Sequence, residues 1–375
     1  MIKLGDVSTM DKLKRFIDVI VPVTTCTLRC HYCYITHHRL FGGPLPNFSH
    51  SPELFSKALS QRRLGGVCMF NLCGGGETLL PPQMPQYIKA LLEEGHYVMV
   101  VTNATTDGAF DIMERWPHEY LERLFFKFSY HDLELKKRGL FNRFFRNIKR
   151  MRDAGASFTL EATPSDELVP FIADMKQQSM EELGAWCHVT VPRSERDMST
   201  IPLLSNMSPN EFYETWRVFD SPFFEYKFSV FGKKQRGFCY GGDWTSWLDM
   251  GTGLLSQCYC SLHKQNIFKD IEKPLSFKPI GHFCQLPHCF NAHAFLTFGA
   301  IPAHEAPTYA VMRNRVCIDG SEWLKPRMKE FMSQKLVQNN DELSVAGKLR
   351  CDAEMTVAVL KKKVFDVARA AKRRW

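Results

Sequence analysis

Three cysteines near the N-terminus have the spacing of metal ligands. They lie within eight residues, directly after the apolar run 16–23, which predicts a loop at the end of a strand. The three are Cys26, Cys30 and Cys33. Free cysteine also packs as a small hydrophobic residue, but a group this dense favours a metal centre. Zinc would find a fourth ligand in His37 or His38, whereas an iron–sulfur cubane on three thiolates would keep one iron open for an external ligand.

The order Cys-x3-Cys-x-aromatic-Cys, in which Tyr32 is the aromatic residue, resembles the signature of the radical S-adenosylmethionine (SAM) superfamily. The resemblance implies a 4Fe-4S cluster bound with SAM, whose amino and carboxylate groups chelate the open iron. In that family the cluster reduces the sulfonium of SAM, and the released 5′-deoxyadenosyl radical abstracts a hydrogen atom. It also implies an electron donor of the flavodoxin or ferredoxin type.

Length and composition suit an ordinary soluble protein. The chain has 375 residues, of which 45% are hydrophobic, enough for one large domain and a smaller one. No apolar stretch approaches the length of a membrane span and no secretory signal is visible, so a cytoplasmic location is expected. Thirteen cysteines then indicate reduced thiols or metal ligands rather than disulfides. The net charge of +8 could attract an anionic substrate or nucleic acid, but much of it lies in residues 361–374, where a solvated helix face is the simpler interpretation.

Apolar runs alternate with helical segments along the first 220 residues. The predicted strands are residues 16–23, 67–73, 97–101, 124–128, 157–162 and 186–191. Six such units predict an α/β fold with a parallel sheet, either an open doubly wound sheet or a curved partial barrel. The family resemblance implies the second, a (βα)6 partial TIM barrel. The expected divisions are an N-terminal extension (1–15), the barrel (16–220), an auxiliary cluster domain (221–320) and a helical tail (321–375).

Polar or glycine-rich motifs follow several predicted strands. Gly75, Gly76 and Glu77, after the second strand, resemble the family's GGE motif, which binds the amino group of SAM. A glycine run alone usually marks only a tight turn. The segment 102–105 resembles a TNG-type motif, with Ala104 where glycine is common. By position, the family implies SAM contacts from four residues, each of which could instead have a capping or turn role. They are Asn103, Ser129, Thr163 and Arg193.

A second set of cysteines follows the barrel. The aromatic, alternating segment 223–230 predicts a β-hairpin that continues to residue 239. The pattern Cys-x13-Gly-x4-Cys from Cys239 to Cys258 then resembles the opening of the SPASM and twitch extensions of radical SAM enzymes. The later cysteines depart from a full SPASM motif, which favours one auxiliary iron–sulfur cluster, with zinc as the alternative. The expected ligands are Cys239, Cys258, Cys284 and Cys289, with Cys260 in reserve.

These features predict hydrogen-atom abstraction from a polar small molecule, such as a sugar or an aminocyclitol, followed by oxidation or epimerisation. Cys260 is a candidate hydrogen donor, and Asp243 and Tyr240 could face the substrate. Modification of a ribosomally made peptide is the alternative among enzymes. A zinc-stabilised nucleic-acid-binding protein is the alternative from another class, but no basic stretch is interleaved with aromatic residues and the glycine–glutamate turn would be unexplained.

Overall fold

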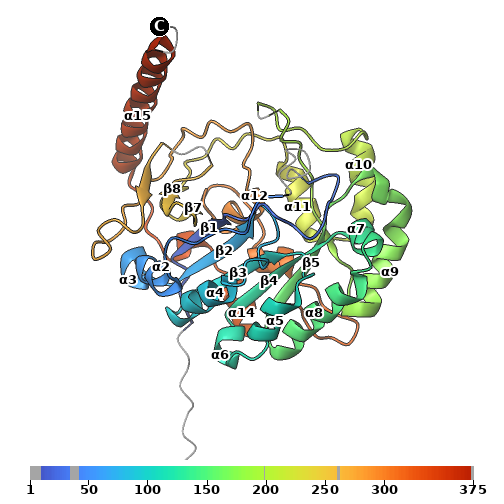
Figure 1. Cartoon of the computed structure of the whole chain (residues 1–375). Helices are drawn as coiled ribbons and strands as arrows, with labels where there is room; N and C mark the ends of the chain where they lie inside the picture. The colour runs from blue at the N-terminus through green and yellow to red at the C-terminus, as the bar shows by residue number, and fades with distance from the viewer. Residues whose placement is uncertain (1–9, 34–41, 198, 260–261, 373–375) are drawn as a thin grey trace, which may run out of the picture.

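A nine-stranded sheet forms the centre of the molecule (Figure 1). The structure, a computed structural model, describes residues 10–33, 42–197, 199–259 and 262–372. The strands are β1 (Arg15–Val21), β2 (Cys68–Gly74), β3 (Tyr97–Thr102), β4 (Leu124–Tyr130), β5 (Ser157–Ala162), β6 (His188–Val189), β7 (Thr245–Asp249), β8 (Leu254–Ser256) and β9 (Lys264–Asn266). Their order in the sheet is β6-β5-β4-β3-β2-β1-β7-β8-β9, and the pairs from β6 to β7 are all parallel.

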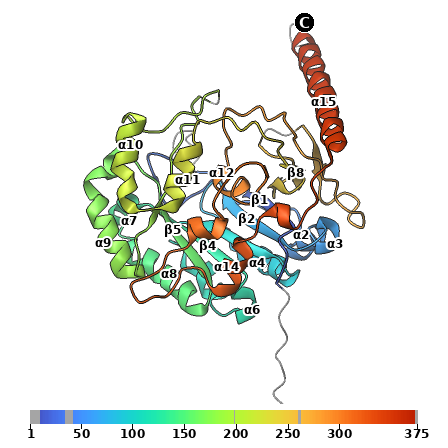
Figure 2. The same cartoon turned by 180° about the vertical axis from the view of Figure 1, so that it is seen from behind.

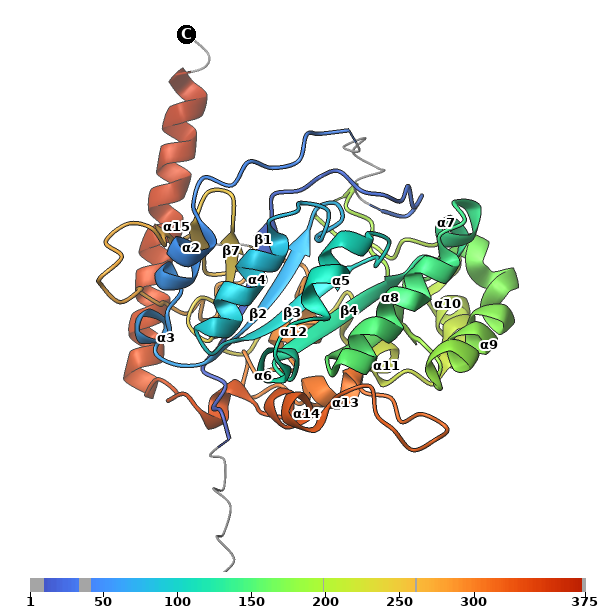
Figure 3. The same ribbon diagram turned by 60° about the horizontal axis from the view of Figure 1, so that its bottom comes forward.

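Helices connect the parallel strands, as the alternation in the sequence predicts. Within the barrel region they are α2 (Pro52–Ala58), α3 (Gln61–Leu64), α4 (Met84–Glu93), α5 (Asp107–Met113), α6 (His118–Leu121), α7 (Asp132–Lys137), α8 (Phe141–Ala154), the 3-10 turn η1 (Asp166–Phe171), α9 (Ile172–Leu183), α10 (Pro209–Trp216) and the 3-10 turn η2 (Arg217–Phe219). Figure 3 shows α4, α5 and α8 covering one face of the sheet. Ser51 and Ser208 are the N-caps of α2 and α10, since each hydroxyl accepts a hydrogen bond from the first turn of its helix.

The two faces of the sheet pack against different cores. Ile17 and Val19 of β1 point into the core beneath α4 and α5, whereas Phe16 belongs to a second core. That second core also contains Met69, Met99 and Phe125 from β2, β3 and β4. It is completed by α11 (Pro222–Val230), α12 (Ala292–Phe295), α13 (Tyr309–Arg313), α14 (Pro326–Met332) and the 3-10 turn η3 (Leu336–Gln338). Helices α11 to α14 therefore pack against the inner face of the parallel sheet.

The β-hairpin predicted from residue 223 is wrong, because residues 222–230 form helix α11. Ser221 accepts a hydrogen bond from the amide of Phe224, and Pro222 has the fixed φ that suits a first helical position. Aromatic residues on several sides of this helix are buried, which gave the segment its false alternation. A hairpin does occur further on, from β7 to β8, and β7 pairs in parallel with β1. The sixth predicted strand is reduced to the two residues of β6.

The C-terminal region is helical only in parts. It contains α14, η3 and α15 (Val345–Lys372), separated by loops. Helix α15 projects from the body of the molecule, as the views from both sides show (Figures 1 and 2). Among the described residues, no helix combines the length and the apolar character needed to cross a bilayer.

Candidate active site

A cavity lies at the C-terminal ends of strands β1 to β4, where parallel strands present their loops together. Its lining comprises Cys26, Leu28, Cys30, Cys33, Cys73, residues 74–78, Val101, Thr102, Asn103, Ser129 and His131. Eight residues predicted from the sequence therefore meet in one place: the three cysteines, Gly75, Gly76, Glu77, Asn103 and Ser129.

The cysteine loop and the glycine loop are bonded to each other through their backbones. The amide of Gly76 donates to the carbonyl of Val23 at 2.5 Å, and the amide of Glu77 donates to that of Thr25 at 3.0 Å. A Cβ on Gly76 would lie 2.6 Å from the carbonyl carbon of Thr25, closer than real Cβ contacts. Position 76 therefore requires glycine because of this close approach.

Glu77 fixes the glycine loop to the end of β3. Its buried carboxylate accepts hydrogen bonds from the Thr102 hydroxyl at 2.5 Å, the Asn103 amide at 2.8 Å and the Leu79 amide at 3.0 Å. Burial raises the pKa of Glu77, and these three donors oppose that effect. Since the carboxylate is occupied in this way, it orients the backbone of residues 74–77 along the cavity wall.

Asn103 connects β3 to the cysteine loop. Its side-chain amide donates to the Thr27 hydroxyl at 3.0 Å and to the sulfur of Cys26 at 3.5 Å. The next residue, Ala104, has a φ of +51°. This left-handed conformation explains why glycine would be common at that position.

The thiol-bearing wall of the cavity has the donor chemistry of an iron–sulfur site. Burial raises the pKa of Cys26 to about 11, and the nearby Glu77 adds to that effect. Burial and the neighbouring thiols Cys33 and Cys26 raise the pKa of Cys30 as well. Three thiolates here would repel one another. Bound iron would relieve this repulsion, which the protein alone does not relieve. Among the described residues, no three His, Cys, Asp or Glu side chains already form a group that could hold a metal ion.

The family model described as Radical SAM superfamily matches residues 20–163. This part of the chain is therefore similar to a radical SAM domain. The match includes the cysteine loop, the glycine loop, Asn103 and Ser129. No curated protein matches the chain.

Several solved structures are similar to this one. SuiB from Streptococcus suis bound to S-adenosylmethionine has a TM-score of 0.47 and 17% identity, over 69% of this chain and 65% of the SuiB chain. The chain thus spans slightly less than two thirds of that enzyme. The native protein anSMEcpe with bound AdoMet and Cp18Cys peptide has a TM-score of 0.44 and 14% identity, over 95% of this chain and 99% of the anSMEcpe chain. BtrN in complex with AdoMet and 2-DOIA has a TM-score of 0.35 and 14% identity, over 70% of this chain and 76% of the BtrN chain.

Neighbours of the cysteines hold the loop of the radical SAM domain in place. The hydroxyl of Tyr32 and Nδ1 of His131 are 2.7 Å apart. Burial lowers the pKa of His131 to about 4, so this imidazole is neutral at pH 7. Glu134 of α7 accepts a hydrogen bond from the amide of Arg29 at 3.0 Å. Thr163 and Arg193, by contrast, do not line the cavity.

The second cysteine set packs on the inner core. Cys258 is buried there, and Cys239, Cys284 and Cys289 pack against the same core. Cys239 forms an isolated β-bridge with Gly281. Cys260 lies outside the described residues.

Gln257 joins the segments that carry Cys239 and Cys258. Its side-chain oxygen accepts from the amides of Leu262 and His263, each at 3.2 Å, and its side-chain nitrogen donates to the carbonyl of Lys278 at 2.9 Å. The amide of Lys278 in turn donates to the carbonyl of Gly242, three residues after Cys239.

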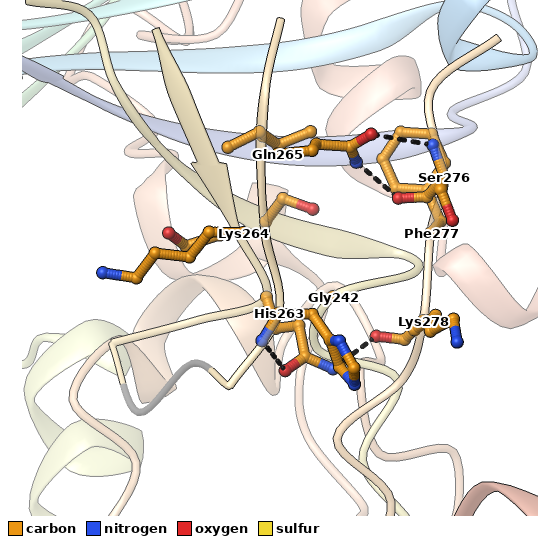
Figure 4. Close-up of a pocket in the computed structure, with 11 residues that line it drawn as sticks. Gly242, His263, Lys264, Gln265, Ser276, Phe277 and Lys278 are labelled. Atoms are coloured by element: carbon orange, nitrogen blue, oxygen red, sulfur yellow. Dashed lines mark hydrogen bonds between the residues drawn. The ribbon is translucent and has the colours of Figure 1, made fainter. Parts of the chain in front are cut away.

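A further hollow lies beside Gln257, between the β8–β9 hairpin and residues 276–278 (Figure 4). Its walls are tied together by two hydrogen bonds between Gln265 and Ser276. Both polar groups of the Gln265 side chain are used in this connection, so Gln265 has a structural role at this hollow.

Asp243 and Tyr240 are placed away from the radical SAM cavity. Asp243 forms an ion pair of 2.8 Å with Arg15, the first residue of β1, whereas the cysteine loop follows the other end of that strand. Tyr240 is buried, stacks on Trp244 at 3.8 Å between ring centroids, and accepts a hydrogen bond from the amide of Leu343. The structure therefore does not bring these two candidates to the cavity.

A polar layer inside the barrel was not predicted from the sequence. Asp18 and Asn71 are register partners on β1 and β2, and the Asn71 side chain donates to the Asp18 carboxylate at 2.6 Å. Lys127 of β4 and Glu161 of β5 form an ion pair of 3.3 Å. Glu161 also pairs with the buried guanidinium of Arg313. The signal available in the sequence is a charged or amide residue within an otherwise apolar strand. Burying such a side chain costs free energy unless it has polar partners.

Proposed function

We propose that this chain is a radical SAM enzyme that abstracts a hydrogen atom from a polar small-molecule substrate. One observation carries the proposal: the three cysteines and the glycine–glutamate loop line the same cavity. A 4Fe-4S cluster on Cys26, Cys30 and Cys33 would supply one electron to the sulfonium of SAM, giving methionine and a 5′-deoxyadenosyl radical that takes hydrogen from carbon.

The residues of the cavity would position SAM. Carbonyl groups of the 74–77 backbone, held by Glu77, would accept hydrogen bonds from the amino group of SAM. Ser129 presents a hydroxyl to the same cavity and would bind the ribose or the carboxylate. Asn103 and Tyr32 would keep the cysteine loop in place through their contacts with Thr27 and His131.

The second cysteine set would hold one auxiliary iron–sulfur cluster. Its ligands would be Cys239, Cys258, Cys284 and Cys289, with Cys260 in reserve. Oxidation requires the substrate radical to lose one more electron and a proton, and the auxiliary cluster would take that electron. Epimerisation would instead need a hydrogen atom returned by a thiol, for which Cys260 is the candidate. A flavodoxin- or ferredoxin-type protein would supply the first electron, as expected for an enzyme of the cytoplasm.

Anaerobic reconstitution tests both metal sites. With two clusters the wild-type protein should bind about eight irons per chain, and about four irons with one zinc would refute the auxiliary cluster. Reduced protein with SAM should form 5′-deoxyadenosine, and Cys30→Ala should abolish this product. Cys317→Ala is the matched control, because Cys317 lies against Leu183 rather than the cavity. If Cys30→Ala forms as much 5′-deoxyadenosine as the control, the proposed function is wrong.

A further inference from the structure

A narrow second cavity in the structure is strongly basic. Arg193, after β6, and Lys227 of α11 line it together with His288, Cys289 and Phe290, so the cavity borders one of the proposed ligands of the auxiliary cluster. The guanidinium of Arg193 lies 4.8 Å from the centroid of the Phe290 ring and donates to the Phe290 carbonyl at 3.1 Å. These contacts hold one cation at the wall of the cavity.

The charges around this cavity do not balance. Arg193 pairs with Glu195 at 3.0 Å, whereas Lys127 and Arg313 both pair with the single carboxylate of Glu161. Four basic side chains, counting Lys227, thus lie around these two carboxylates, and the Asp18 carboxylate of the polar layer also interacts with Lys127. In the described part of the chain no carboxylate lies within 4.0 Å of the Lys227 ammonium, which donates to the Thr190 hydroxyl at 2.5 Å. An excess of positive charge in a partly desolvated site favours an anion.

Buried donors beside the cavity lack acceptors. The side chain of Arg313 is fully buried, and its Nε and Nη2 atoms have no hydrogen-bond partner in the described part of the chain. The buried Nδ1 atom of the half-buried His293 also has no partner among the described residues. Both residues lie around the ring of Phe223, with the Arg313 guanidinium 3.8 Å from its centroid, and the Lys227 ammonium is 5.6 Å from the same centroid. Unsatisfied donors of this kind are rare in folded proteins and mark sites that a ligand completes.

The basic group adjoins the radical SAM cavity. Ser129, which lines that cavity, is the register partner of Glu161, and Lys127 lies two residues before Ser129 on the same side of β4. A molecule anchored at Lys227 would therefore extend along the polar layer toward the site where hydrogen would be abstracted.

We propose that Lys227 and Arg193 bind an anionic group, a carboxylate or a phosphate, of the substrate. This inference rests on the proposed function, since it assigns the substrate subsite of that enzyme. Burial, together with the charges of Arg193 and Lys127, lowers the pKa of Lys227 well below its usual value. A bound anion would oppose that effect and restore the ammonium.

Binding of inorganic phosphate and of acetate to the full-length protein tests the subsite. Each anion is titrated at constant ionic strength, set with chloride, and the melting temperature is followed. Lys227→Met and Arg193→Met should each raise the dissociation constant of the stabilising anion at least tenfold. Whichever of the two anions stabilises the wild type more strongly identifies the substrate group as phosphate or carboxylate. The controls Lys233→Met and Arg196→Gln change exposed residues and should bind the anion as the wild type does.

The melting temperature without anion separates binding from misfolding. Because Lys227 is a half-buried basic side chain with no carboxylate partner in the described part of the chain, Lys227→Met should be at least as stable as the wild type, while Lys227→Arg should retain anion binding. If neither anion stabilises the wild type, or if Lys227→Met binds it as tightly, the inference is wrong. Formation of 5′-deoxyadenosine without substrate is measured in the same samples. If the wild type forms no 5′-deoxyadenosine, the proposed function is wrong. If it forms 5′-deoxyadenosine but binds neither anion, only the subsite is wrong.

Discussion

Replacing Gly76 by alanine should separate the two loops that form the radical SAM cavity. The added Cβ would lie 2.6 Å from the carbonyl carbon of Thr25 and 2.7 Å from that of Thr24. Both atoms belong to backbone, so no rotation of a side chain can remove the clash. The cysteine loop must move instead, and it then loses the hydrogen bonds from Gly76 to Val23 and from Glu77 to Thr25.

The expected cost of Gly76→Ala follows from these contacts. Two hydrogen bonds contribute about 1–3 kcal/mol together. Overpacking against fixed atoms adds a strain of about 1–3 kcal/mol. The total of about 2–6 kcal/mol is a large part of the stability of a typical domain. Displacement of the loop should also prevent Cys26, Cys30 and Cys33 from binding iron together.

Urea unfolding of the protein without iron measures the first effect, and iron content after reconstitution measures the second. Gly108→Ala is the control, because a Cβ at that position in α5 meets no atom within 4 Å and alanine favours a helix. Gly108→Ala should be as stable as the wild type or more so, with full iron. If Gly76→Ala unfolds at the same urea concentration as the wild type and binds the same amount of iron, the inference that the two loops require glycine at position 76 is wrong.

Substitutions at three further positions test local parts of the fold. Ala104→Gly should change the free energy of unfolding by less than about 1 kcal/mol, because relief of the left-handed strain is offset by the loss of a buried methyl group and by a more flexible unfolded chain. Ala104→Val should lower the free energy of unfolding by at least about 2 kcal/mol. Equal urea midpoints for the two variants would contradict this. Ser208→Ala should cost about 1 kcal/mol in the same assay, because it removes the capping box of α10, and Ser229→Ala is the exposed control. Burial lowers the pKa of His96 to about 4, below about 6.5 in the unfolded chain, so the folded state binds fewer protons between these pH values. About 3 kcal/mol of stability should therefore be lost as pH falls from 6.5 to 4, and His96→Gln should reduce that slope; an unchanged slope would show that His96 titrates normally.

The apolar runs predicted the parallel strands because each strand is buried on both faces, as residues 97–102 and 157–162 illustrate. The loops that follow them were predicted because short motifs such as residues 75–77 need special backbone geometry. Helix α11 was missed because Phe223, Phe224 and Tyr226 are all buried, so no single polar face gave a helical period. Strand β7 could not be predicted as a barrel strand, since its pairing with β1 depends on residues more than two hundred positions apart.

That pairing connects the two sets of cysteines. The amide of Met250, directly after β7, donates to the carbonyl of Ile20 at 3.0 Å, only six residues before Cys26. Strand β7 also lies between Cys239 and Cys258 in the chain, and its hairpin partner β8 ends two residues before Cys258. A metal on the second set would therefore stabilise the β7–β8 part of the sheet, on which the first cysteine loop depends because β1 has β2 on one side and β7 on the other. The second set would thus support the geometry of the first cavity in addition to any redox role.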